Sequence, residues 1–133
     1  SKTTAPHAIS YPLSMYFNIS HGHAVALTLG YFFNINTKIN EIDVVDSRGK
    51  KYVLTTMNEI FDLFSQSNAN HCKKFWYKLM QNIKLETNIS KLGIRSKQDI
   101  EKIIENIDPV RIKNNPTKIN KTIIKNILQD LQS

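Results

Sequence analysis

Apolar residues recur every three or four positions along most of the chain, and this period limits the fold more than any other feature of the sequence. A spacing of 3.6 residues puts such side chains on one face of an α-helix, whereas strict alternation indicates a strand. The longest set is Ile119, Ile123, Ile124, Ile127, Leu128 and Leu131. The pattern predicts an all-α protein, with about six helices forming one bundle-like domain over residues 1–133.

Residues that favour helix N-termini mark where several of these helices should begin. Thr4 and Ser20 precede the first two periodic segments, and Ser96 precedes a later one. Thr56 and Glu59 have the spacing of a capping box, in which a hydroxyl and a carboxylate each accept a hydrogen bond from a free backbone N–H group. We therefore expect one helix to begin at Thr56.

The period is lost near residues 34–55, which are rich in Asn and Asp. Such residues favour turns because their short side chains bond to nearby backbone groups. We expect one irregular connection here. A short hairpin of residues 42–45 against 51–54 is an alternative for part of it.

The net charge of +7 arises in the second half of the chain, where residues 71–133 carry thirteen Lys and Arg against six Asp and Glu. These basic residues are spread along helical segments, so we favour a solvated basic surface over a nucleic-acid-binding one. No apolar run reaches the ~18 residues that a membrane span needs. The lone Cys72 cannot form an internal disulfide, which favours the reducing cytoplasm.

Two of the four histidines, His7 and His21, are fourteen residues apart. On one continuous helix this separation is roughly 21 Å, too far for both to bind one metal ion. The segment 18–20 breaks the helix between them, so a chain reversal can bring the two residues together. Two histidines at this spacing are more often ordinary polar residues than metal ligands. His71 and Cys72 are adjacent and cannot converge on a helix, so we expect a surface histidine and a core cysteine.

The two segments around these histidines, TAPHAISYPL (residues 4–13) and FNISHGHAVALTL (residues 17–29), resemble the second metal motif of the iron-dependent (group III) alcohol dehydrogenases. The residues of these segments are most similar to those of the branch that includes phosphonoacetaldehyde reductases. In that family a histidine on one helix and a His-Gly pair opening the next both bind the metal. The resemblance implies that His7 and His21 are metal ligands. Tyr11 stands where many relatives have another histidine, and it either shapes the substrate pocket or packs as an ordinary aromatic residue.

The resemblance implies a function for a longer enzyme. That enzyme would oxidise a small alcohol, or reduce the aldehyde, with NAD or NADP as cofactor and divalent iron, or zinc, as the metal. The family's upstream metal ligands and its amino-terminal nucleotide-binding domain would precede Ser1. We therefore expect the 133 residues alone to be inactive and the amino-terminal nucleotide-binding domain to be their partner. The sequence does not decide whether the protein forms a homo-oligomer. The alternative is a non-catalytic basic helical module that binds nucleic acid or a protein.

Overall fold

The computed structural model describes residues 4–38, 44 and 46–133, and within them it confirms the all-α prediction. These residues form seven α-helices, one 3₁₀ helix and no strand beyond an isolated bridge between Val44 and Thr117. The helices are α1 (Ala5–Phe17), α2 (His21–Ile35), α3 (Gly49–Leu63), α4 (Ala69–Asn82), η2 (Ile89–Leu92), α5 (Lys97–Glu105), α6 (Pro109–Ile112) and α7 (Lys121–Leu131). No helix of the described residues is long and apolar enough to cross a membrane.

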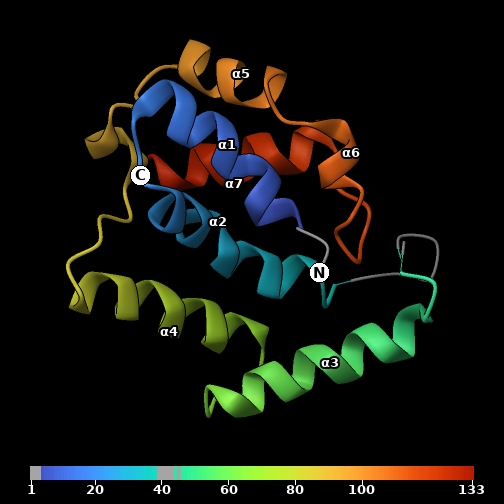
Figure 1. Ribbon diagram of the computed structural model, residues 1–133. Helices are drawn as coiled ribbons and strands as arrows, with labels where there is room; N and C mark the ends of the chain where they lie inside the picture. The colour runs from blue at the N-terminus through green and yellow to red at the C-terminus, as the bar shows by residue number, and fades with distance from the viewer. Residues whose placement is uncertain (1–3, 39–43, 45) are drawn as a thin grey trace.

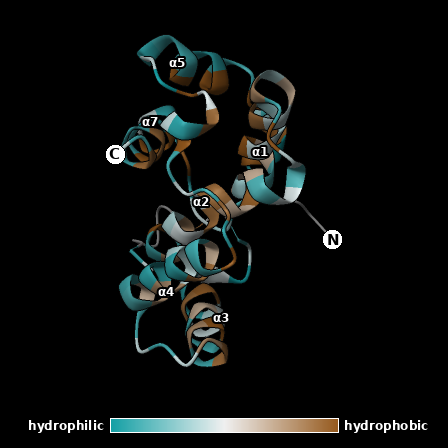
Figure 2. Ribbon diagram, turned by 90° about the vertical axis from the view of Figure 1, so that its left-hand side faces the viewer, coloured by the Kyte–Doolittle hydropathy of each residue, from teal (hydrophilic) through white to brown (hydrophobic). Residues whose placement is uncertain are grey.

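Helix α2 runs between two groups of helices (Figure 1). One group contains α1, α5, α6 and α7, and the other contains α3 and α4; Figure 2 shows the same division after a quarter turn. The larger core includes Ile9, Leu13, Leu27, Ile103 and Leu128, and the smaller one contains Phe33, Val53, Met57, Phe61 and Cys72. Helix α2 contributes to both cores, so it sets the position of the two groups relative to each other.

The reversal between α1 and α2 is short and sharp. Asn18 ends α1 in the left-handed backbone conformation, with φ 54° and ψ 35°. Asparagine is among the few residues that adopt this conformation at low cost. Ile19 is buried in the larger core, and α2 begins two residues later. Thr4 and Ser20 occupy the N-cap positions as predicted, although neither side chain makes a capping hydrogen bond.

The predicted first residue of the third helix was wrong. Helix α3 begins at Gly49, so Thr56 and Glu59 lie inside it and do not cap it. Val53 is buried one turn before Met57 and Phe61, which extends the apolar stripe toward the N-terminus. Residues 51–54 are therefore helical and cannot form the hairpin. Of its other half, residues 42, 43 and 45 lie outside the described residues.

Sequence and structure agree at the start of α5. Ser96 Oγ accepts a hydrogen bond from the backbone N–H of Asp99 at 3.0 Å, and the Asp99 carboxylate accepts one from the N–H of Ser96, also at 3.0 Å. This reciprocal pair is a complete capping box. The single-turn α6, which begins after Asp108, accounts for a seventh helix where about six were expected.

Candidate metal centre

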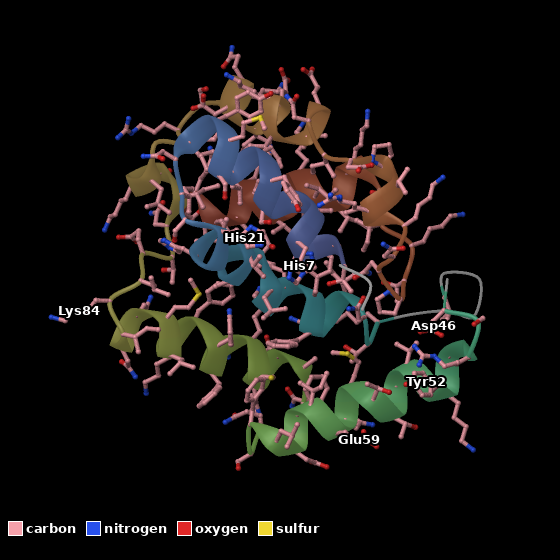
Figure 3. All side chains as sticks on the ribbon, viewed as in Figure 1. His7, His21, Asp46, Tyr52, Glu59 and Lys84 are labelled. Atoms are coloured by element: carbon pink, nitrogen blue, oxygen red, sulfur yellow. The ribbon has the colours of Figure 1, made fainter. Side chains whose placement is uncertain are left out.

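The structure brings His7 and His21 together from neighbouring helices (Figure 3). His7 lies in the first turn of α1 and His21 is the first residue of α2. Their ring centroids are 6.1 Å apart, with 48° between the ring planes. Two imidazoles that each bind one metal at about 2 Å have centroids roughly 4.5–5.5 Å apart. The two rings would therefore have to move closer by about 1 Å to share an ion.

The environment of His7 supplies a test of whether these residues suit a metal. His7 Nδ1 is buried and has no hydrogen-bond partner in the described part of the chain. Leaving a buried polar atom unsatisfied costs about 1–3 kcal/mol. Imidazole nitrogen is a good ligand for divalent iron or zinc, so the pair fits such an ion. Nowhere within residues 4–38, 44 and 46–133 do three or more His, Cys, Asp or Glu side chains group to complete a metal site.

Ser10 contacts both histidine residues and was missed by the sequence analysis. Its side chain is fully buried in α1. Ser10 Oγ donates a hydrogen bond to the backbone oxygen of His7 at 2.6 Å and lies 3.4 Å from His21 Nδ1. Its position three residues after His7, on the same helix face, was the available signal.

Tyr11 also lies close to His21. The two ring centroids are 6.0 Å apart, and Tyr11 is 46% exposed. The Arg111 guanidinium of α6 lies over the Tyr11 ring, with Cζ 4.2 Å from the ring centroid. Arg111 also pairs with Asp108 at 3.5 Å. The centre thus has a phenol and a cation along one edge, and the sequence analysis did not include the cation.

The other two histidines do not join this pair by any contact in the described residues. His23 Nε2 lies 2.7 Å from the backbone oxygen of Glu86, which connects α2 to the segment after α4. His71 is exposed and bonds to Ser67 Oγ at 2.7 Å. Cys72 is fully buried, as predicted, and burial raises the pKa of its thiol.

A cavity of about 890 Å³ opens beside the start of α3, where its lining includes Asp46, Arg48 and Tyr52. Thr4 reaches its edge, but neither His7 nor His21 lines it. The cavity is therefore separate from the histidine pair.

The sequence and the fold of this chain are similar to those of known proteins. Residues 1–132 match the C-terminal domain of the Fe-containing alcohol dehydrogenase family. Phosphonoacetaldehyde reductase from Streptomyces viridochromogenes is 35% identical over 60 residues, which cover 45% of this chain and 15% of that protein. The crystal structure of sulfoacetaldehyde reductase from Bifidobacterium kashiwanohense in complex with NAD+ has the same fold, with a TM-score of 0.74 and 23% sequence identity.

The second alignment covers 99% of this chain and 31% of the reductase. The chain therefore spans less than a third of the length of either relative. Because the family match runs over almost every residue, the chain belongs to the Fe-containing alcohol dehydrogenase family, within its C-terminal domain.

Proposed function

We propose that this chain is the metal-binding part of an NAD(P)-linked alcohol dehydrogenase or aldehyde reductase, in which His7 and His21 bind a divalent metal. The observation that carries the proposal is the neighbouring pair of rings, with centroids 6.1 Å apart, together with a buried Nδ1 on His7 that has no hydrogen-bond partner in the described structure. Family membership favours iron, and zinc would accept the same nitrogens.

A divalent metal held by this pair would supply Lewis acidity to the oxygen of an alcohol or aldehyde. His7 and His21 would fix where that oxygen lies relative to α1 and α2. Tyr11 lies beside His21, and we assign this partly exposed residue to the wall of the substrate pocket, where its hydroxyl group can donate a hydrogen bond.

We assign the nicotinamide cofactor, NAD or NADP, to an amino-terminal nucleotide-binding domain that also provides the remaining metal ligands. This assignment is supported by the share of the NAD+-bound reductase that the chain covers, 31%. The 133 residues on their own should therefore bind metal weakly and catalyse no hydride transfer. The buried free thiol of Cys72 suits a cytoplasmic enzyme.

The substrate we propose is a small aldehyde, or its alcohol, that carries an anionic group. Both relatives are named for such aldehydes, one a phosphonate and the other a sulfonate. Arg111 provides a cation at the edge of the centre. Its guanidinium can donate two parallel hydrogen bonds to the oxygens of one phosphonate or sulfonate group.

Metal binding can be tested on the 133-residue chain by titrating Co²⁺ into ¹⁵N-labelled protein and recording amide spectra. Even weak binding broadens the signals of residues near the ion. Broadening should centre on the first turns of α1 and α2, and it should weaken at least tenfold in His7→Ala and in His21→Ala. His71→Ala is the matched control, because His71 is exposed and distant in sequence from the pair. Equal broadening in all four proteins would refute the assignment.

The anionic substrate can be tested in the enzyme assembled with its nucleotide-binding domain. A charged hydrogen bond contributes about 1.5–3 kcal/mol. Arg111→Gln should therefore raise KM roughly 10- to 150-fold for a phosphonate or sulfonate aldehyde and leave KM for an uncharged aldehyde unchanged. An equal loss for both substrates would contradict a role in recognising the anion.

A further inference from the structure

Ser10 forms two contacts that together restrict the protonation pattern of His21. Its Oγ lies 2.6 Å from the backbone oxygen of His7 and 3.4 Å from His21 Nδ1. The serine is fully buried in α1, whereas His21 is exposed at the start of α2. A buried hydroxyl group therefore contacts an imidazole that is exposed to solvent.

The direction of these hydrogen bonds follows from counting protons. A serine hydroxyl has one proton, and a backbone oxygen can only accept. The short contact with the His7 oxygen therefore uses the Ser10 proton. Only lone pairs of Oγ remain for His21, so the second contact is favourable only when His21 Nδ1 carries the proton. A neutral imidazole has one N–H, which leaves the lone pair on His21 Nε2.

We propose that Ser10 is a positioning residue that holds neutral His21 in the tautomer with its proton on Nδ1, so that His21 presents Nε2 to the metal. Histidines that bind metals usually donate their other ring N–H to an oxygen acceptor, which orients the ring. Loss of such a partner typically weakens metal binding 10- to 100-fold. The metal half of this inference rests on the proposed function, whereas the tautomer is a property of the chain itself.

The tautomer can be read without metal and without any variant. Long-range ¹H–¹⁵N spectra of the labelled chain at about pH 8, where an ordinary imidazole is neutral, distinguish a protonated from an unprotonated ring nitrogen. We expect His21 Nδ1 to be protonated and Nε2 to be free. A wild-type spectrum with the proton on Nε2 would overturn the proposal directly.

Ser10→Ala tests the role of the hydroxyl, with Ser14→Ala as the matched control. Ser14 lies one turn further along α1, and its buried Oγ has no hydrogen-bond partner in the described structure. Ser10→Ala should move His21 toward the Nε2-protonated form and weaken Zn²⁺ binding roughly tenfold or more. Ser14→Ala should change neither property. Circular dichroism confirms that both variants are folded before they are compared.

The outcomes separate the two proposals. An unchanged His21 tautomer in Ser10→Ala would refute the role of Ser10, and a changed tautomer with unchanged Zn²⁺ affinity would refute its link to the metal. If wild-type protein keeps the expected tautomer but binds Zn²⁺ no better than His21→Ala, the metal assignment fails and the tautomer inference stands.

Discussion

The ring of Tyr77 lies against Gly30, where the residue on α2 has no side chain to keep α4 away. A β-carbon at residue 30 would lie 2.9 Å from Tyr77 Cζ and closer still to Cε2. The Tyr77 hydroxyl donates a hydrogen bond to the backbone oxygen of Leu27 at 2.6 Å, and Trp76 Nε1 donates one to that of Ala26 at 2.9 Å. The absence of a side chain at Gly30 therefore permits the close contact between α2 and α4.

Gly30→Ala should destabilise the protein despite the better helix propensity of alanine. Propensity alone favours alanine by up to about 1 kcal/mol, whereas overpacking a fixed contact costs about 1–3 kcal/mol. Urea denaturation should therefore show a lower free energy of unfolding. Gly22→Ala is the control, because it lies in the same helix and a β-carbon there would have nothing within 4 Å. A similar gain in stability from both substitutions would show that Tyr77 yields easily.

A buried amide holds the loop before α7 against the end of α2. Asn115 Nδ2 donates to Asn36 Oδ1 at 2.9 Å and to the backbone oxygen of Thr117 at 3.0 Å. Asn115→Asp would replace this donor with an oxygen and bury a charge. We therefore expect the free energy of unfolding to fall by about 3 kcal/mol or more. Asn114→Asp adds the same charge one residue earlier and should cost far less. Comparable losses in a thermal denaturation series would contradict the importance of this hydrogen-bond network.

The capping box of α5 should make stability depend on pH. Hydrogen bonds from the backbone N–H groups of Ser96 and Arg95 hold the pKa of the Asp99 carboxyl group below its usual value. A carboxyl group with a lowered folded-state pKa stabilises the fold when ionised, and this stabilisation disappears as pH falls through that pKa. Asp99→Asn should therefore lower Tm near pH 7 and have progressively less effect below about pH 4. A Tm difference that stays constant from pH 7 to pH 2 would exclude this mechanism.

Cys72 should be unreactive in the folded protein. Its side chain is fully buried between α2, α3 and α4, and burial raises the pKa of the thiol, so little thiolate is present or accessible. We expect a disulfide reagent to label native protein only as fast as it unfolds. In denaturant the same reagent should label one thiol per chain at once. Rapid labelling under native conditions would indicate that the smaller core opens easily.

Sequence reasoning succeeded where the signal was local. The break at residues 18–20 and the periodic stripes on either side predicted two helices with a reversal between them, which the structure contains. That His7 and His21 form a pair was expected from the family resemblance, because their spacing alone favoured two ordinary polar residues. The start of α3 was missed because no side chain caps it and because Thr56 happens to have capping-box spacing inside a helix. Arg111 was missed for a different reason. It reaches Tyr11 across one hundred residues of sequence, and only tertiary packing creates that contact.

The left-handed turn at Asn18 has a consequence for how this centre can evolve. An α-helix rotates by about 100° per residue. One residue inserted between Phe17 and His21 would therefore either bulge outward or swing His21 to a different side of α2. Natural variants should tolerate exchanges of side chains in this connection far better than changes in its length, so that the number of residues, more than their identity, is what selection preserves there.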